Sequence, residues 1–526
     1  MTIAESLFLK EQSPDQLGFT KGISYLLGAV LRVECQRWAL DTKKTCFGVT
    51  FDGKAAFPSV DRDIQVRELY TCGEDGDLLQ YSRNTYKNTV SHMKQNNKLS
   101  REFTEWKGSR QGHKRAAGHF KSYINPCLTA TDSSELGFWI GPICVTSFCI
   151  ADDTYVLSGD PRKLQDIINI VGHYGKRYRL IFGADKTKVT ITGSKHDMKY
   201  YKEILLWSIY GQKLVVADDN EHLGLIVSGT DEEIKNIDKN IESARKTMFG
   251  LLGQTLSYRC KLSPLVQYHI WTIYIKPVLR SGLPALPIRP NTLKTLTTFH
   301  HKTMRGILKL SQSSPLTPLY FLLGEIPMEA TIHLDMLSLF WNIWSNPQTK
   351  VFEVVKYLLK MTDNNSLSWS AHLRIISQLY SLPDPPALME GSLWSKEKWK
   401  EHIKAVVISY HELSLRKKAS RNYKLRFLNV QVSGLSGKPH PVLSWILTTQ
   451  DVMRARIHIK MVSGDYLCHD HLAKDRGLDP ACRLCQPVLP HPAPKEDQIH
   501  LLTICKATAD TRSRTIPTFL TAVEDI

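Results

Sequence analysis

Three acidic residues stand at the ends of apolar segments, where carboxylates would have to meet a cation. Asp52 follows the run CFGVTF at 46–51, and Asp152 and Asp153 interrupt the apolar stretch ICVTSFCIADDTYVLSG at 143–159. Carboxylates gathered at the ends of buried strands repel one another, and one of them must take up a proton unless a cation is present. Two adjacent strands can hold two Mg²⁺ about 4 Å apart, an arrangement that activates a hydroxyl and stabilises an in-line phosphoryl displacement. Taken singly, each aspartate could instead be a turn residue.

A basic loop with two glycines lies between these acidic positions. The segment 107–115 reads KGSRQGHKR, and from 101 to 121 six Lys or Arg accompany two Glu. A flexible backbone beside an Arg and a Gln suits a close approach to a phosphate and a base. Alone, this pattern indicates only a basic loop. Its position after Asp52 and before Asp152–Asp153 makes a role in binding a phosphate and a base a stronger prediction.

The tripeptide Ala151-Asp-Asp153 occurs a second time, as Ala217-Asp-Asp219 between two apolar runs. The helix-then-strand pattern that follows Asp153 over 161–192 is missing after this second copy. Because Asp is common in hairpin turns, we predict a polar turn at 217–219 rather than a second acidic site.

A separate set of residues near the end of the chain has the spacing of a metal site. Three cysteines and a histidine follow the pattern Cys482-x₂-Cys485-x₁₄-His500-x₄-Cys505. Three thiolates and an imidazole can close a tetrahedral Zn²⁺ site, and four protein ligands leave no position for water, so the site would be structural. His491 is a rival ligand, and free core cysteines are the alternative reading.

The elements that must position these residues change character along the chain. From about 44 to 194, apolar strands alternate with amphipathic helices: strands at 46–51 and 187–193, a hairpin around Asp152–Asp153, and helices after 59 and after 160. Two further strands are predicted in the segments 213–218 and 222–228. This alternation indicates an α/β or α+β unit. After about Asp231 the pattern is helical, with helices predicted over 328–344 and 394–415 and linkers at 382–391 and 433–441.

Charge and composition narrow the class of protein. The 526 residues carry a net charge of +17, and the 42% apolar content excludes a disordered or collagen-like chain. Between 243 and 324, eleven Lys or Arg occur without any Asp or Glu, which favours contact with phosphates over a merely solvated surface. Eleven scattered cysteines favour a reducing compartment, and we find no signal peptide and no membrane-spanning segment.

In this order the motifs resemble those of the reverse transcriptase domain of non-LTR retrotransposons, the LINE-type elements. The resemblance spans residues 14–228 and is carried by Gln16-Leu-Gly-Phe19, Asp52-Gly-Lys-Ala-Ala-Phe57, Arg110-Gln-Gly112, Ala151-Asp-Asp153, Gly183-Ala-Asp-Lys-Thr-Lys188 and His222-Leu-Gly224. It implies an α+β right-hand polymerase palm with partial fingers, then a mostly α-helical thumb and C-terminal region with a zinc knuckle. The implied parts are 1–230 (fingers and palm), 231–345 (basic thumb), 346–445 (helical connector) and 446–526 (zinc knuckle region).

The resemblance also implies a role for each matching residue. Asp52 and Asp152 would bind both catalytic Mg²⁺ ions beside Asp153, with the Phe51 carbonyl as a further candidate ligand. Lys186 or Lys188 would protonate the leaving pyrophosphate. The incoming nucleotide would contact Phe57, whose bulk excludes a 2′-hydroxyl, and the loop of Arg110, Gln111 and Gly112. Contacts to nucleic acid are expected from His222, Gly224, Arg245, Lys246, Arg259 and Lys261, and from Arg512 and Arg514.

These implications amount to an RNA-directed DNA polymerase that needs Mg²⁺ and dNTPs, holds structural Zn²⁺ and binds an RNA template with a DNA primer. The chain begins almost at Gln16, so we expect an element truncated at its N-terminus. The stretch after Gly112 departs from the family pattern, so the family's roles are not carried over to the residues that follow it. The alternative is a catalytically inactive relic that only binds nucleic acid. The expected location is intracellular, nuclear during reverse transcription, with a cytoplasmic ribonucleoprotein stage.

Overall fold

The computed structural model describes residues 12–53, 55–110, 112–113, 115–253, 262–361, 366–425, 428, 430–431, 434–435, 437–444, 449–465, 479–485, 494–496, 500–501, 505–510 and 513. The chain forms two compact units, each made of segments that are distant in the sequence. Unit 1 comprises 1–240, 280–293 and 332–406, and unit 2 comprises 241–279, 294–331 and 407–526. The four consecutive parts expected from the sequence stay a prediction.

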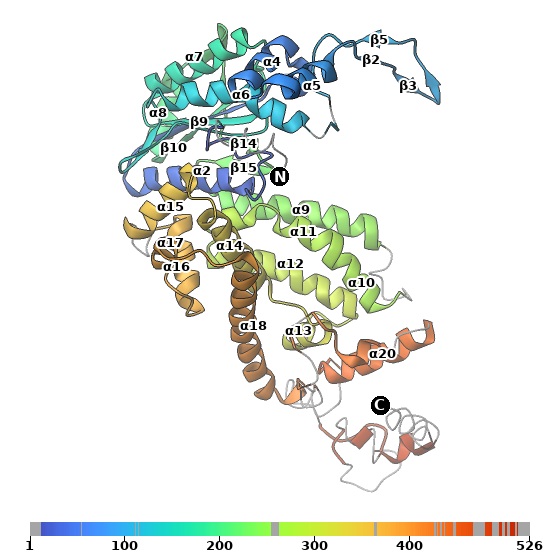
Figure 1. The fold of residues 1–526 in the computed structure, drawn as a ribbon. Coiled ribbons are helices and arrows are strands. Elements are labelled where there is room, and N and C mark those ends of the chain that lie inside the picture. The colour runs from blue at the N-terminus through green and yellow to red at the C-terminus, as the bar shows by residue number, and fades with distance from the viewer. Residues whose placement is uncertain are drawn as a thin grey trace. The chain divides into compact units, whose positions relative to one another are not determined.

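A five-stranded sheet is the centre of unit 1 (Figure 1). Its order is β13-β10-β1-β9-β8, with β1 (Cys46–Phe51) antiparallel to both β9 (Asp153–Ser158) and β10 (Lys188–Thr192). β8 (Ser147–Ile150) pairs with β9 as the predicted hairpin, and β13 (Val215–Val216) runs parallel to β10. The predicted strands at 46–51 and 187–193 are therefore confirmed.

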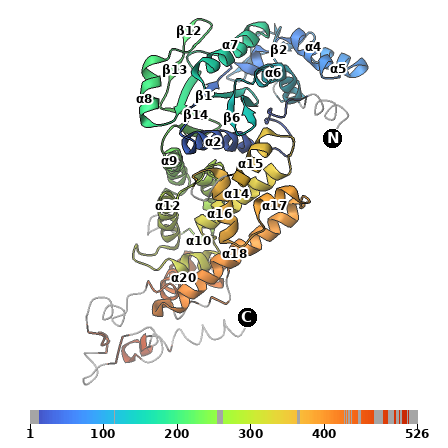
Figure 2. The ribbon, with the colours of Figure 1, turned by 90° about the vertical axis from the view of Figure 1, so that its left-hand side faces the viewer.

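Helices cover both faces of this sheet (Figures 1 and 2). On one face, α6 (Ala116–Asp132) and α7 (Pro161–Arg177) bury the large apolar residues of β1, β9 and β10 in one core. On the other face, α2 (Leu26–Asp41) approaches so closely that a Cβ at Gly28 would lie 2.7 Å from the ring of Phe148. The remaining helices and turns of unit 1 are α3 (Ala56–Ser59), α4 (Arg62–Thr71), α5 (Gly76–Tyr86), α8 (Lys195–Ile204), η3 (Leu283–Ala285), α15 (Lys350–Met361), α16 (Trp369–Leu379) and α17 (Pro385–Glu390).

Local sequence signals explain where several of these helices begin. Asp61 caps α4 by accepting hydrogen bonds from the amides of Asp63 and Ile64. Asp160 caps α7 in the same way, and Pro161 occupies its first turn, as predicted. The stretch 382–391 was expected to be a linker, but its prolines begin the short helix α17 instead.

Five two-stranded sheets complete the described part of unit 1. They pair β2 (Val90–Ser91) with β5 (Phe103–Thr104), β3 (Lys94–Gln95) with β4 (Lys98–Leu99), β6 (Phe138–Ile140) with β7 (Ile143–Val145), β11 (Ser208–Ile209) with β12 (Gln212–Lys213), and β14 (Asp219–His222) with β15 (Leu225–Ser228).

Unit 2 is helical in the residues that the structure describes. It contains α10 (Pro264–Ile270), the π-helical turn η2 (Trp271–Ile275), α13 (Thr317–Leu323), η4 (Tyr423–Leu425), α19 (Pro441–Ser444), α20 (Thr449–Val462) and η6 (Lys506–Thr508). Five helices have residues in both units: α9 (Glu232–Leu252), α11 (Lys276–Arg280), α12 (Pro290–Leu308), α14 (Met328–Trp344) and α18 (Lys396–Ser420). The helix predicted over 328–344 is α14. None of the helices among the described residues is long and apolar enough to span a membrane.

Candidate active site and metal centre

Strand pairing brings the three acidic residues to one end of the sheet. β1 and β9 are neighbours in the register Phe51↔Thr154, so Asp52 leaves β1 beside Asp153 at the start of β9. β8 and β9 close with the pair Ile150↔Asp153, which puts Asp152 in the turn between them. Ala151 adopts a φ of 61°, a left-handed conformation that makes this tight turn possible. The pairings of β1 with β9 and of β8 with β9 therefore bring the three predicted carboxylates together.

The carboxylates influence one another electrostatically. Burial raises the pKa of Asp152, and the nearby charge of Asp52 raises it further. Burial together with the charges of Asp152 and Asp52 raises the pKa of Asp153 to about 6. Like charges held together in partly desolvated positions are costly, and a bound cation would relieve that cost. The donor set is thus suited to divalent metal ions.

A lysine reaches the same carboxylates from the loop before β10. Lys186 Nζ lies 3.0 Å from Asp52 Oδ2, and this hydrogen bond and the charge of Asp52 raise the pKa of Lys186. The loop is fixed to β1 because the Gly183 amide donates to the Asp52 carbonyl (3.2 Å) and Gly53 bridges to Phe182. Lys188, the rival candidate, stands inside β10 in register with Thr50. Of the two candidate lysines, Lys186 contacts Asp52, and the role of either one as a general acid stays a prediction.

Phe57 lies in the short helix α3, directly after the segment that carries Asp52. Its ring stacks on Phe120 of α6, with centroids 4.4 Å apart and planes at 16°. The basic loop is tied to the same helix, since the Ser109 amide donates to the Phe57 carbonyl (2.8 Å) and the Gly108 amide to the Val60 carbonyl (2.7 Å). Phe120, which sequence reasoning did not single out, supports Phe57 from beneath, and the apolar spacing of α6 could have indicated it.

The basic loop after α3 changes from buried to exposed between Ser109 and Arg110. Arg110 and Gly112 are exposed, whereas Ser109 is buried and lies 3.2 Å from the Tyr86 hydroxyl. Gly112 has a φ of 82°, a left-handed conformation that glycine adopts readily, and a Cβ added there would meet no other atom within 4 Å. The backbone conformation, rather than a lack of space, therefore favours glycine at this turn. Gln111 lies outside the described residues. Arg110 and Gly112 therefore share one exposed loop with an anchored base.

The structure does not expose His222. Its ring is 4% exposed and packs on Tyr155 and Phe148, with centroids 5.1 and 6.0 Å away, and burial lowers its pKa to about 3. The expectation of a nucleic-acid contact from this side chain is therefore wrong, because the ring forms part of the core between the sheet and β14. Gly224 is exposed in the β14–β15 turn, so its contact with nucleic acid stays a prediction.

The second acidic tripeptide is unrelated to the site. Asp218 is exposed and forms an ion pair with Lys202 (2.8 Å), and Asp219 forms one with Lys235. Asp218 lies in a bend between β13 and β14, and Asp219 is the first residue of β14, so the turn predicted at 217–219 is observed only as a bend at Asp218.

The unbalanced basic block is partly neutralised by acids from other segments. Arg245 and Lys246 are exposed on α9, although Lys246 pairs with Glu242 (2.7 Å), and Arg259, Lys261, Arg512 and Arg514 lie outside the described residues. Other members pair with acids beyond the block: Lys276 with Glu325 (2.8 Å), Arg280 with Asp335 (2.7 Å), and Arg289 with Asp231 and Glu233. The block therefore offers fewer cations to a partner than the sequence suggested.

The four predicted metal ligands in unit 2 converge. The ligand atoms of Cys482, Cys485, His500 and Cys505 all lie within 4.8 Å of one another and are buried. Cys485 Sγ is 3.4 Å from Cys505 Sγ and 3.3 Å from His500 Nε2, and the sulfurs of Cys482 and Cys505 are 4.0 Å apart. Thiolates about 2.3 Å from one tetrahedral Zn²⁺ would be about 3.8 Å apart. His491, the rival ligand, lies outside the described residues.

An ion pair between Arg483 and Glu496 holds Cys482 and Cys485 in place. Glu496 is 3% exposed and accepts from the Arg483 amide (3.0 Å) and guanidinium (2.7 Å), between Cys482 and Cys485. The Cys482 amide donates to the Pro494 carbonyl (2.8 Å), which ties the two segments together. Such outer hydrogen bonds fix the ligand positions, as they do around metals generally.

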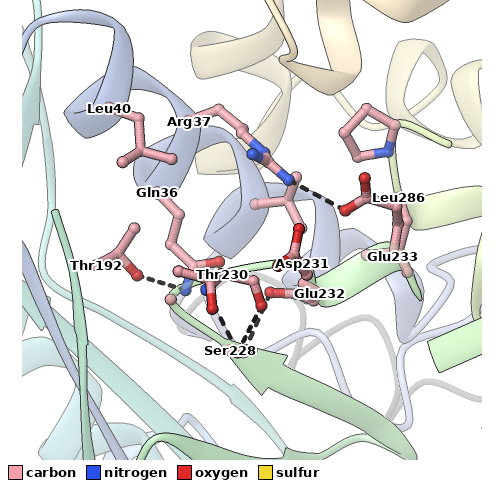
Figure 3. A pocket seen from close by; sticks show the side chains of 13 residues that line it. Gln36, Arg37, Leu40, Thr192, Ser228, Thr230, Asp231, Glu232, Glu233 and Leu286 are labelled. Carbon is pink, nitrogen blue, oxygen red and sulfur yellow. Dashed lines mark hydrogen bonds and ion pairs between the residues drawn. The ribbon is translucent and has the colours of Figure 1, made fainter. Parts of the chain in front are cut away.

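A pocket in unit 1 lies at the far end of the sheet from the acidic residues (Figure 3). Its walls come from α2, the end of β10, the end of β15 and the start of α9. Thr192 lines it and is in register with Cys46, the first residue of β1, whereas Asp52 follows the last. At about 3.3 Å per residue, the pocket is about 20 Å from Asp52 along β1.

Ion pairs close this pocket. Glu233 lies near Arg37 (3.6 Å; Figure 3) and also binds Arg289, and Glu232 forms a buried ion pair with Arg32 (2.6 Å). Gln36 Nε2 donates to Thr192 Oγ1 (3.0 Å). These contacts fix the first turn of α9 against α2, so these polar groups of the pocket bind one another.

Comparison with known families identifies the part of the chain that carries the acidic site. Residues 2–236 match the family described as reverse transcriptase (RNA-dependent DNA polymerase). The chain carries a reverse transcriptase domain. This domain contains the sheet, the three carboxylates, Lys186 and Phe57, and it ends within the first turns of α9. The predicted nucleotidyltransferase class is thereby supported in general terms.

No curated protein matches the sequence significantly. Two similar solved structures are a telomerase from Candida albicans in complex with a TWJ fragment of telomeric RNA (11% identity, TM-score 0.34, 71% of this chain and 58% of that chain covered) and apo telomerase from Candida tropicalis (8%, 0.36, 70% and 60%). The chain thus spans 58–60% of the length of these two telomerases.

Proposed function

We propose that this protein is an RNA-directed DNA polymerase of the non-LTR retrotransposon type, which extends a DNA primer on an RNA template with two Mg²⁺ ions. The observation that carries the proposal is the register that joins β1, β9 and β8. It gathers Asp52, Asp152 and Asp153 at one sheet end, inside a domain that matches reverse transcriptases.

Asp52 and Asp152 would hold the metal ions, with Asp153 as the neighbouring acid. The raised pKa values of Asp152 and Asp153 support this assignment, because burial and the nearby acidic charges disfavour their ionised forms in the absence of a cation. Bound Mg²⁺ would activate the primer 3′-hydroxyl and offset charge on the transferred phosphoryl group. Carboxylate oxygens are the ligands that Mg²⁺ takes in such sites.

The chain's own side chains would do the remaining work. Lys186, whose Nζ contacts Asp52, would give a proton to the departing pyrophosphate. Phe57, fixed on Phe120, would lie under the sugar and exclude a 2′-hydroxyl by its bulk. The exposed Arg110 and Gly112 would contact the nucleotide and template base, and Arg245 and Lys246 the phosphate backbone. An RNA–DNA duplex would be recognised mainly by its A-like shape.

The cysteine cluster would bind Zn²⁺ structurally, as a knuckle near the end of the chain. Its four ligands are buried and close enough to share one ion. We further propose that the protein works in the nucleus, where a DNA primer is available, after a cytoplasmic stage bound to RNA.

Primer extension tests the proposed function. The purified chain, given poly(rA)/oligo(dT), dTTP and Mg²⁺, should lengthen the primer, and Asp152→Asn should abolish this activity. Incorporation that persists in Asp152→Asn would refute the assignment of the active site. A wild-type chain that only retards the oligonucleotide in a gel would instead identify an inactive, nucleic-acid-binding relic.

A further inference from the structure

Phe19 combines an exposed ring with an unfavourable backbone conformation. Its φ is 53°, in the left-handed region, and its side chain is 58% exposed. Bulky residues rarely adopt this conformation, and such outliers gather at functional sites where the surrounding structure holds them. Burial cannot compensate for the strain at Phe19, because most of the ring faces solvent.

The loop that holds Phe19 is fixed beside the acidic turn. The Leu17 amide donates to the Cys149 carbonyl (2.8 Å), and the Cys149 amide donates to the Asp15 carbonyl (2.9 Å), so the segment lies along β8. Gly18 packs directly on the turn: a Cβ there would lie 2.3 Å from the Ala151 amide nitrogen. Phe19 is therefore held next to the turn that carries Asp152.

A second anchor fixes the other side of the loop. Lys121 of α6 is largely buried, and its Nζ donates to Thr20 Oγ1 (2.8 Å). Thr20 Oγ1 also lies 3.2 Å from the Gly18 carbonyl. Anchors on β8 and on α6 together over-determine the conformation of Phe19, which explains how the strain is retained.

The ring of Phe19 meets the ring of Phe57. Their centroids are 6.3 Å apart and their planes are at 88°, an edge-to-face contact. Phe57 is already stacked on Phe120, which is fully buried. The two outer rings thus form an aromatic corner, with one wall following Asp52 in the chain and the other beside Asp152.

We propose that Phe19 is a second wall of the nucleotide site, contacting the sugar of the incoming dNTP and holding the Phe57 ring in the position that excludes a 2′-hydroxyl. This inference rests on the proposed polymerase function and adds a specificity-determining residue to it. It explains why a strained, exposed phenyl ring is held between the β8–β9 turn and Phe57 of α3.

Steady-state kinetics on poly(rA)/oligo(dT) test the proposal with dUTP and UTP, which differ only in the 2′-hydroxyl. Phe19→Ala should raise the KM for dUTP about tenfold, the size of one aromatic contact, while changing kcat less than twofold. The preference for dUTP over UTP should also fall severalfold, because Phe57 loses its edge contact. Tyr70→Ala, which removes an aromatic of similar exposure (63%) on α4, should change neither value.

Phe19→Gly separates a nucleotide contact from a packing role. Glycine accepts a positive φ without strain, so this variant should unfold at the same or a higher temperature than wild type while its KM rises. A KM and sugar preference like those of Tyr70→Ala would overturn the proposal, as would a Phe19→Gly variant that loses stability and kcat together. Extension by wild type but not by Asp152→Asn shows that the polymerase assignment stands in either case; a wild-type chain without extension would refute both.

Discussion

Glu325 offers a sharp test of how unit 2 is held together. This carboxylate is 2% exposed and lies one residue beyond the basic block, yet it receives three partners from it. Lys276 Nζ is 2.8 Å away, His300 Nε2 is 3.1 Å away, and the Tyr268 hydroxyl also donates to it. Glu325→Gln would leave the partly buried ammonium group of Lys276 without its counterion.

Two independent routes give the size of the effect. Breaking a buried ion pair by removing one partner costs about 3–5 kcal/mol. The partners His300 and Lys276 outweigh burial and lower the pKa of Glu325 from 4.5 to about 2, which at 1.36 kcal/mol per pH unit corresponds to about 3 kcal/mol. Because the folded-state pKa is depressed, this stabilisation is present above pH 4.5 and is lost as the pH falls toward 2.

Hydrogen exchange read by mass spectrometry localises the loss to α10 and α12, which carry Tyr268 and His300, and to α13, which ends just before Glu325. Amides of α10, α12 and α13 that exchange through opening of unit 2 should exchange about 100- to 1000-fold faster in Glu325→Gln than in wild type at pH 7. Glu242→Gln, which removes an exposed pair with Lys246, should leave these rates unchanged. Rates in Glu325→Gln that stay within threefold of wild type would refute the argument that this carboxylate stabilises the unit.

Three further predictions concern single groups. Replacing Lys186 by Leu should slow single-nucleotide incorporation about 100-fold in rapid-quench experiments, and Lys188→Leu should not, because only Lys186 contacts Asp52. Burial raises the pKa of Glu34 to about 7, so the folded state loses stability as the pH rises from 4.5 to 7. In urea unfolding, Glu34→Gln should therefore be more stable than wild type by about 1–3 kcal/mol at pH 8, and it should show no such gain at pH 4. Elemental analysis of protein purified without chelator should find one Zn²⁺ per chain, and the Co²⁺-substituted protein should show the absorption of a tetrahedral thiolate site. Cys485→Ser should abolish both signals. A metal content near zero in wild type would exclude the site.

The sequence predicted the acidic site because its geometry follows from local patterns. Each carboxylate directly follows or begins an apolar strand, and the hairpin around Asp152–Asp153 is encoded within a dozen residues. Once Asp52 ends the neighbouring strand, pairing of β1 with β9 is enough to bring the groups together. The cysteine cluster was predictable for the same reason, since its spacing alone nearly specifies a shared ligand sphere.

Features that depend on distant partners could not be predicted. The window 243–324 contains no acid, but the acids that neutralise Lys276, Arg280 and Arg289 come from segments just outside it. His222 sits in a motif whose pattern says nothing about burial, and its ring faces Phe148 and Tyr155 because the β14–β15 hairpin folds over the sheet. A single sequence also gives no signal that Phe19 has a positive φ.

Single-turnover incorporation of one dTTP is the most direct test of the central claim, that the carboxylates joined by β1, β8 and β9 form a metal-dependent polymerase site. Matched variants are available because the chain carries the same tripeptide twice: Asp152→Asn changes the proposed site, and Asp218→Asn changes the exposed copy. We expect wild type and Asp218→Asn to incorporate the nucleotide at equal rates with Mg²⁺, and Asp152→Asn to be at least about 100-fold slower. Equal rates for Asp152→Asn and wild type, or equal losses in both variants, would contradict the account.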